Sequence, residues 1–184
     1  MLAKSIVLLS AFAGLIAAMP TPTEHTGPSG TVPLTGVTHT VVAGRGGLRF
    51  DPDNVVAEVG DVVEWHFLPR NHAVAQSSFA NPCTPLANST GFYSGFNFAV
   101  QEGQAENVFQ VVVEDGRPTW YYCPQLNGAH CQNGMVGVIN QNFDSPDFDL
   151  RAHRRLAALT GVSVIPAIQQ GGEVVENPNP LSGF

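Results

Sequence analysis

Between residues 39 and 140, short segments rich in β-branched and aromatic residues alternate with turn residues, and this alternation restricts the fold more than any other feature. In the segment VVEWHFL the large apolar side chains share one face, whereas Glu64 and His66 share the other. The segment NVFQVVVED has the same period of two, which is typical of a half-buried strand. Strands of this length and spacing predict an all-β fold, a Greek-key β-sandwich or barrel. The pattern also places His66 at the surface.

The first eighteen residues have the composition of a secretory signal peptide. Lys4 gives a positive start, an apolar run follows, and small residues at Ala17 and Ala18 predict cleavage after Ala18. The run is shorter than the roughly twenty apolar residues that a membrane span needs, and no second run of that length follows. The C-terminus also lacks the hydrophobic tail of a lipid-anchor signal. We therefore expect residues 1–18 to be removed from a secreted, extracellular protein that has no transmembrane segment.

The 184 residues are enough for one ordinary domain with tails. Residues 19–38 are rich in Pro, Thr, Gly and Ser, and we expect them to be a flexible lead-in. The β domain is expected over residues 39–142. A short C-terminal α-helix is expected over residues 143–161 and a mobile tail over residues 162–184.

The expected helix has recognisable start and stop signals. Ser145 is placed to cap it, with Pro146 at the first helical position, and Gly161 is placed to end it. Apolar residues at helical spacing predict that one stripe of this helix packs against the β domain. The stripe consists of Phe148, Ala152, Leu156 and Leu159.

The net charge and the cysteine content of the chain limit the classes of function that it can have. Eight Lys and Arg against fifteen Asp and Glu give a net charge of −7, which argues against a nucleic-acid partner. Disulfides persist outside the cell, and the chain has three cysteines, Cys83, Cys123 and Cys131. At most one disulfide can form, so at least one cysteine keeps its thiol, which could serve as a metal ligand. The number of cysteines does not say which thiol that is.

One loop between two expected strands presents three potential metal ligands. The segment CPQLNGAHCQNGM contains the thiolate of Cys123, the imidazole of His130 and the thioether of Met135. A second imidazole, His72, begins another β-rich segment. Two imidazoles and one thiolate with a weak axial thioether form a blue-copper electron-transfer site. The sequence contains this set of ligands once.

The chain resembles the cupredoxins, and among them the phytocyanin-like cupredoxin domains of secreted fungal proteins. The resemblance lies within about residues 39–140, in the segments FDPDNVVAEVGDVVEWHFLPRNHAV, SSFANPCTPL and YYCPQLNGAHCQNGMVGVIN. It implies a cupredoxin fold and one type 1 copper ion. The copper ligands that it implies are His72, Cys123, His130 and, as the axial ligand, Met135.

The resemblance also implies a disulfide between Cys83 and Cys131, because in phytocyanins a disulfide cysteine directly follows the histidine ligand. Two features depart from the plant phytocyanins. Six residues separate Cys123 from His130, where plant phytocyanins usually have four. The residue after the first histidine is often polar and orients the cysteine sulfur, but here it is Ala73, so that hydrogen bond must come from elsewhere or be absent.

Other interpretations of these residues stay open. Cys123 could be a buried free thiol and Met135 a packing residue at the start of a strand. The remaining histidines, His25, His39 and His153, are assigned no metal role. Asn88 begins the sequon Asn-Ser-Thr, which makes it a candidate glycosylation site in a secreted protein.

The leading hypothesis is a secreted, monomeric copper protein that transfers single electrons to an unknown redox partner. The alternative is a structural or interaction protein of the cell surface or cell wall, with a cupredoxin fold but no redox function. An enzyme is not expected, since the sequence lacks the His-x-His pairs of multicopper oxidases and the common hydrolase motifs.

Overall fold

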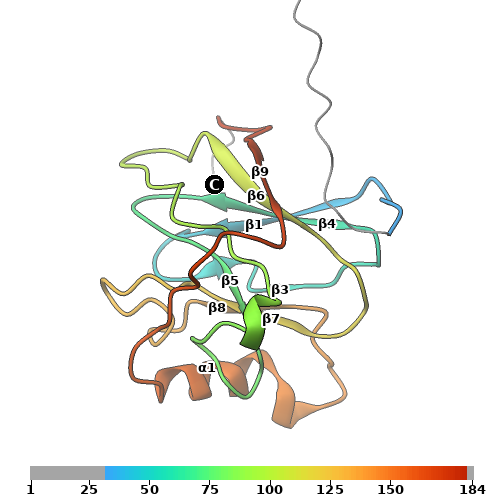
Figure 1. Cartoon of the computed structure of the whole chain (residues 1–184), viewed down its shortest axis with the longest axis vertical. Coiled ribbons are helices and arrows are strands. Elements are labelled where there is room, and N and C mark those ends of the chain that lie inside the picture. Colours follow the sequence, from blue (N-terminus) through green and yellow to red (C-terminus); the bar gives the residue numbers. More distant parts are fainter. Residues whose placement is uncertain (1–31, 182–184) are drawn as a thin grey trace, which may run out of the picture.

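The computed structural model describes residues 32–181, which form two β-sheets and one α-helix (Figure 1). The expected signal peptide, most of the expected lead-in and residues 182–184 lie outside the described residues. The first sheet has the strand order β2-β1-β4-β6-β9 and the second the order β3-β8-β7-β5. None of the helices within residues 32–181 is both long and apolar enough to cross a bilayer.

The strands are short, as the sequence pattern predicts. Those of the first sheet are β1 (Thr38–Ala43), β2 (Phe50–Asp51), β4 (Val62–Phe67), β6 (Asn107–Val112) and β9 (Glu173–Glu176). Those of the second sheet are β3 (Asn54–Val55), β5 (Ala75–Ser77), β7 (Thr119–Tyr122) and β8 (Val136–Ile139). A 3₁₀ turn over Ala87–Ser89 lies in the long connection between β5 and β6.

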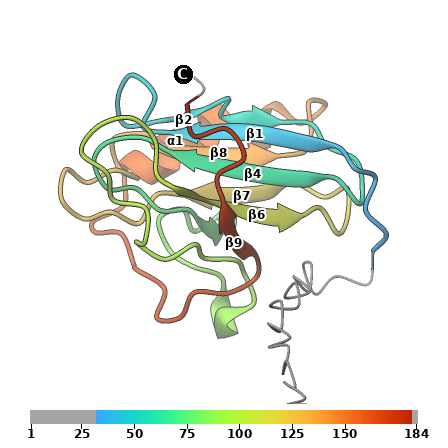
Figure 2. The same cartoon turned by 90° about the horizontal axis from the view of Figure 1, so that it is seen from above.

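The main core cluster draws on both sheets, with Trp65 from the first and Tyr121 from the second. Figure 2 shows the sheets from above. On β4 the alternating residues Val63, Trp65 and Phe67 are fully buried, so the predicted apolar face is confirmed. The Trp65 ring meets the ring of Tyr121 edge-on, with centroids 5.3 Å apart. A Cβ atom on Gly137 would lie 2.3 Å from Cζ of Tyr121, so this position of β8 accepts only glycine without moving the ring.

The prediction that His66 lies at the surface is wrong. His66 is 1% exposed and Glu64 is 3% exposed, although both lie on the outer face of β4. Their side chains form an ion pair with Nε2 of His66 2.6 Å from Oε1 of Glu64. Gln104 lies 2.9 Å from the other ring nitrogen, and Gln110 donates to the second carboxylate oxygen at 2.6 Å. Residues from outside the strand therefore cover the outer face of the sheet.

The C-terminal segment supplies part of this cover. The prediction of a mobile tail over residues 162–184 is therefore wrong for the part that the structure describes. Strand β9 pairs antiparallel with β6 and forms an edge of the first sheet. Beyond it, the buried Asn177 donates hydrogen bonds from its side-chain nitrogen to Oε1 of Gln104 and the carbonyl of Ala105. The segment pairs with β6 because the backbone N–H and C=O groups at that edge of β6 would otherwise be unpaired.

The helix also differs from the prediction. Helix α1 (Leu150–Ala158) is capped by Asp149, whose Oδ1 accepts from the N–H of Ala152 at 2.6 Å. Pro146–Phe148 is a separate 3₁₀ turn. The helix packs against β8 as predicted, and its buried residues are Leu150, Ala152, His153 and Ala157. Of the predicted stripe, Ala152 is therefore buried, whereas Phe148 and Leu159 are exposed. Asp149 takes the cap because its side chain reaches the free N–H groups of the first turn, which Ser145 does not.

The end of the lead-in is fixed to the domain rather than free. The N–H of Thr35 donates to the carbonyl of Gly60, and its hydroxyl donates to Oδ1 of Asp61 at 2.5 Å. His39 binds the other oxygen of the same carboxylate at 2.7 Å. Residues several positions before β1 are thus already held against the domain.

Candidate metal centre

The candidate ligands lie where several strands end at the same end of the sandwich. Strands β1 and β4 run parallel with Ala43 opposite Phe67, so the chain leaves both strands at this end. Cys123 directly follows β7 and Met135 directly precedes β8, so the two antiparallel strands fix both ends of the loop. His72 lies between β4 and β5, and β5 pairs with β7.

The structure brings His72, Cys123 and His130 together. One side-chain donor atom from each lies within 4.8 Å of the other two. Sγ of Cys123 is 3.3 Å from Nδ1 of His130, and the two imidazole rings have centroids 4.9 Å apart. All three side chains are buried, with His130 the most exposed at 7%. The arrangement is a compact N₂S donor set within the described residues.

The second nitrogen of His72 determines which atom is available to a metal. Nε2 lies 3.3 Å from the carbonyl oxygen of Pro69, which can only accept, so Nε2 carries the proton. Nδ1 is buried and has no hydrogen-bond partner among residues 32–181. A Cβ atom on Gly44 would lie 2.5 Å from Nε2, so the backbone of Gly44 holds the ring from one side. Orphaned buried nitrogens are costly, and a bound metal would remove that cost.

In the metal-free protein, none of the three candidate ligands carries a charge at neutral pH. Burial lowers the pKa of His72, and burial together with neighbouring His72 lowers the pKa of His130 to about 4. Both imidazoles are therefore neutral, with lone pairs free, at neutral pH. Burial raises the pKa of the Cys123 thiol to about 11, so in the metal-free protein it keeps its proton. A metal cation would replace that proton and turn the thiol into a thiolate ligand.

The hydrogen bond that Ala73 cannot provide through its side chain comes from the backbone. The backbone N–H groups of Ala73 and Gln125 hydrogen-bond to the sulfur of Cys123 and oppose the effect of burial on its pKa. Such donors hold a thiolate in place and stabilise its charge. This departure from the phytocyanin pattern therefore leaves the sulfur oriented.

The long loop between Cys123 and His130 closes through consecutive turns. The N–H of Ala129 donates to the carbonyl of Leu126, and the N–H of His130 donates to that of Gln125. The N–H of Met135 then donates to the carbonyl of His130, and the N–H of Cys123 to that of Met135, both at 3.0 Å. The additional residues are thus taken up inside the loop without separating the sulfur from the imidazole.

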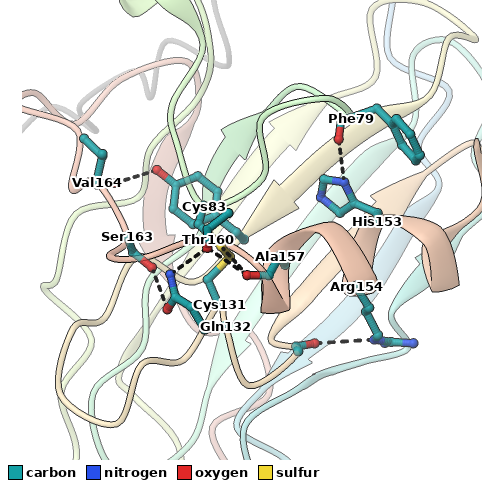
Figure 3. Close-up of a disulfide and its surroundings, with 12 residues drawn as sticks. Phe79, Cys83, Cys131, Gln132, His153, Arg154, Ala157, Thr160, Ser163 and Val164 are labelled. Carbon is teal, nitrogen blue, oxygen red and sulfur yellow. Dashed lines mark hydrogen bonds between the residues drawn. A yellow bond between two sulfur atoms is a disulfide. The ribbon is translucent and has the colours of Figure 1, made fainter.

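A disulfide joins this loop to the rest of the domain. Cys83 and Cys131 form the bridge that the resemblance implied, and it lies buried next to α1 (Figure 3). Gln132, the next residue, donates to the hydroxyl of Thr160 at 3.0 Å and accepts from Ser163 at 3.3 Å (Figure 3). Cys131 and Gln132, the two residues after His130, are therefore both held in place.

Helix α1 and the segment after it hold the same loop at two further points. Arg154 donates to the carbonyl of Gly134 and forms an ion pair with Asp53. The hydroxyl of Tyr122, the residue before Cys123, donates to the carbonyl of Val164 at 2.6 Å. No sequence motif marks these contacts, which sequence reasoning missed together with Gly44 and Pro69.

Three other residues from the sequence analysis have defined positions. Met135 is fully buried and belongs to the same core cluster as Cys123, which is compatible with both the axial-ligand and the packing interpretation. Asn88 is exposed in the 3₁₀ turn Ala87–Ser89, with positive φ. His153 is buried against Trp120 and binds the carbonyl of Phe79, apart from the metal cluster.

Two curated fungal proteins are similar to this chain, both from Arthroderma benhamiae. The "Extracellular serine-rich protein" is 39% identical over 101 residues, which are 55% of this chain and 38% of that protein. The "Probable GPI-anchored cupredoxin-1" is 34% identical over 132 residues, which are 72% of this chain and 64% of that protein. The chain thus spans less than two thirds of the length of either relative. No model of a known protein family matches the chain.

Among solved structures, the native pseudoazurin from Hyphomicrobium denitrificans is similar, with a TM-score of 0.37 and 21% identity. The match covers 56% of this chain and 73% of that protein. The two-sheet architecture, together with 34% identity to a protein named as a cupredoxin, makes the fold of this chain cupredoxin-like.

Proposed function

We propose that this chain is a secreted copper protein that transfers single electrons and is not an enzyme. In this proposal His72, Cys123 and His130 bind one copper ion, and Met135 is a weak axial ligand. The observation that carries it is the buried N₂S cluster, in which Nδ1 of His72 has no partner and Nδ1 of His130 lies 3.3 Å from the Cys123 sulfur. The alternative role for Cys123, an inert core thiol, does not account for two imidazoles gathered around it.

The donor set fits copper in both of its common oxidation states. Copper, when bound, supplies a one-electron couple between Cu(II) and Cu(I). The thiolate suits Cu(I) and the imidazoles suit both states. A structural zinc site takes four strong ligands, commonly Cys and His, and the described cluster offers three. Met135 as a weak fourth ligand therefore favours copper.

The protein's own residues hold the donors in place and keep water away. The Pro69 carbonyl and Gly44 fix the His72 ring, and the backbone N–H groups of Ala73 and Gln125 fix the sulfur. A ligand set that is held rigid changes little when the metal changes charge, which keeps the reorganisation cost of electron transfer low. The burial of Cys123 protects the thiolate from oxidation.

The proposed location is outside the cell. One relative is named as extracellular and the other as GPI-anchored, and the first eighteen residues match a signal peptide. The exposed position of Asn88 supports its glycosylation on the secretory route. Treating the secreted protein with a peptide N-glycosidase would shift its mass if Asn88 carries a glycan.

The decisive experiment is to add Cu(II) to the mature protein and record its visible absorption spectrum. We expect an intense blue thiolate-to-copper charge-transfer band, which Cys123→Ser and His130→Ala abolish. His39→Gln, a histidine substitution away from the cluster, is the matched control and should keep the band. No band in the folded wild-type protein, with Cys123 still titrating as a free thiol, would refute the proposal and favour a structural or interaction role at the cell surface.

The axial ligand has its own test. Met135→Gln should keep copper and lower the reduction potential, because the strength of the axial donor tunes it. An unchanged potential would make Met135 a packing residue.

A further inference from the structure

Two Asn-Gly pairs lie in the loop that carries the candidate ligands. They are Asn127-Gly128 and Asn133-Gly134, and the whole chain contains no others. Asparagine is among the thermolabile residues of proteins. It loses its side-chain amide most readily before glycine, because a residue without a side chain leaves its backbone nitrogen accessible for reaction. The two pairs differ in how the structure holds them.

The first pair lies in a turn that leaves both reacting groups free. The N–H of Ala129 donates to the carbonyl of Leu126 at 3.0 Å, so Asn127 and Gly128 are the central residues of a four-residue turn. Gly128 has a φ of +87°, and a positive φ at the third position of a turn favours glycine. Both central residues are exposed. In the part of the chain that the structure describes, neither the N–H of Gly128 nor the side-chain amide of Asn127 has a hydrogen-bond partner.

The second pair is hydrogen-bonded at each of the same groups. The N–H of Gly134 donates to the carbonyl of Cys131 at 2.9 Å, and Cys131 is itself held by the disulfide to Cys83. The side-chain nitrogen of Asn133 donates to the carbonyl of Gly128 at 2.7 Å. Reaction at this pair therefore requires two hydrogen bonds to break, whereas reaction at the first pair requires none.

We propose that Asn127 is a site of spontaneous deamidation and that Asn133 is protected from it. The backbone nitrogen of Gly128 attacks Cγ of Asn127 and forms the new C–N bond of a cyclic succinimide. The bond from Cγ to Nδ2 breaks, and Nδ2 leaves as ammonia with the proton of the Gly128 N–H. The nucleophile and the carbonyl are tethered in one dipeptide, so no enzyme is needed. Water then opens the ring at either carbonyl to give aspartate or isoaspartate, and nothing is oxidised or reduced.

Isoaspartate at position 127 lengthens the main chain of the ligand loop. In isoaspartate the main chain runs through Cβ and Cγ, so one extra carbon atom separates residues 127 and 128. That atom lies inside both turns of the loop, the one closed by Ala129 and Leu126 and the one closed by His130 and Gln125. A turn of this kind closes only at a fixed chain length, so we expect both hydrogen bonds to break.

The change reaches the candidate metal centre through His130. Nδ1 of His130 lies 3.3 Å from Sγ of Cys123, and the backbone of Gly128 lies so close that a Cβ atom on it would be 3.5 Å from Cδ2 of His130. The disulfide holds Cys131 on the other side, so residues 124–130 must absorb the extra length. We therefore expect the imidazole to move away from the sulfur, which exposes Cys123. Weaker copper binding follows as well, and that last consequence rests on the proposed function.

The first experiment measures deamidation at each pair in the metal-free mature protein. Folded protein, and the same protein reduced and unfolded in guanidinium chloride, are incubated in mildly alkaline buffer, and tandem mass spectrometry follows the conversion of amide to acid. In the unfolded protein both pairs should react at similar rates. In the folded protein Asn127 should react at least about tenfold faster than Asn133, which corresponds to breaking one or two ordinary hydrogen bonds. Reaction of Asn133 as fast as Asn127, or protection of both, would overturn the proposal.

The second experiment isolates the effect of the longer main chain. Anion-exchange chromatography separates the deamidated protein by its additional negative charge, and a thiol reagent then measures the accessibility of Cys123. The isoaspartate form should react at least about tenfold faster than fresh protein, in which Cys123 is fully buried and reacts only after local opening. The matched control Asn127→Asp adds the charge without the extra carbon atom and should react as slowly as fresh protein. An isoaspartate form that reacts no faster than this control would refute the effect on the loop.

The failure of this inference can be distinguished from the failure of the proposed function. Deamidation and thiol reactivity are measured without metal, so a missing blue band in fresh protein refutes only the proposed function. Where fresh protein shows the band, the isoaspartate form should show a weaker band at equal copper. Asn127→Gln, whose longer side chain disfavours the cyclic imide, should keep the full band after the same incubation. An equally strong band in the isoaspartate form would refute the effect on copper binding.

Discussion

The buried ion pair between Glu64 and His66 provides a quantitative test of the packing on the outer face of β4. Glu64→Ala removes both the acceptor for Nε2 of His66 at 2.6 Å and the acceptor for Gln110. Removing one partner of a buried pair costs about 3–5 kcal/mol, because it leaves an uncompensated charge in the interior. For a domain of this size that corresponds to a decrease in Tm of roughly 6–20 °C.

The pH dependence of the stability that this ion pair contributes follows from the directions in which the two pKa values are shifted. Burial opposes ionisation of both groups, yet hydrogen bonds from His66 and Gln110 hold the pKa of Glu64 below its usual 4.5. Hydrogen bonds from His66 to Glu64 and Gln104 hold the pKa of His66 above its usual 6.5. The contribution of Glu64 is lost as the pH falls through its folded pKa, and that of His66 as the pH rises through its own. The pair therefore stabilises most between about pH 4.5 and 6.5.

Urea unfolding of wild type and Glu64→Ala at about pH 5.5 and 8.5 measures this contribution. The difference in the free energy of unfolding should be largest at the lower pH and shrink at the higher one. Thr40→Ala is the matched control, because Thr40 pairs with Glu64 across β1 and β4 but is exposed. A cost under about 1 kcal/mol, or a difference independent of pH, would refute the assigned ion pair.

Three further predictions concern other parts of the domain. Replacing both Cys83 and Cys131 with alanine opens a loop with a sequence separation of 48, and the free energy of unfolding should fall by about 4 kcal/mol in urea titrations. Gly137→Ala places a methyl group 2.3 Å from the Tyr121 ring and should lower that free energy by about 1–3 kcal/mol, whereas an unchanged value would show that the ring can move. Hydrogen bonds from Thr35 and His39 lower the pKa of Asp61 to about 2, so the stability gap between wild type and Asp61→Asn should close between about pH 4 and 2.

The sequence predicts the part of the fold that depends on one face of each strand. The alternation around Val63 and Trp65 identifies β4 and its core face, because burial between the sheets selects apolar residues there. It does not identify what covers the other face. His66 looks like a surface residue because Gln104 and Asn177, which enclose it together with Gln110, come from distant segments.

The C-terminal part was harder to predict for a local reason. Strand β9 has only four residues, between two glycines and the sequence Asn177-Pro178, and four residues carry little periodic signal. Its position depends on pairing with the edge of β6. The helix start shifted from Ser145 to Asp149 because two possible caps lie within one turn of each other.

For the candidate site, residue type and order were sufficient to select His72, Cys123 and His130, which the structure gathers into one cluster. Backbone groups that hold them could not be predicted. The carbonyl of Pro69 and the N–H of Ala73 have no side-chain signature, because every residue type offers such groups.

Strand β9 also bears on the behaviour of the chain during synthesis. Until residues 173–176 emerge, β6 presents an open edge to other chains, although the ligand-bearing loop is already complete. A nascent or truncated protein that ends before Glu173 would therefore contain all four candidate ligands and still be prone to pair strand to strand with its own copies. Solubility, rather than metal binding, is the property that the last strand protects.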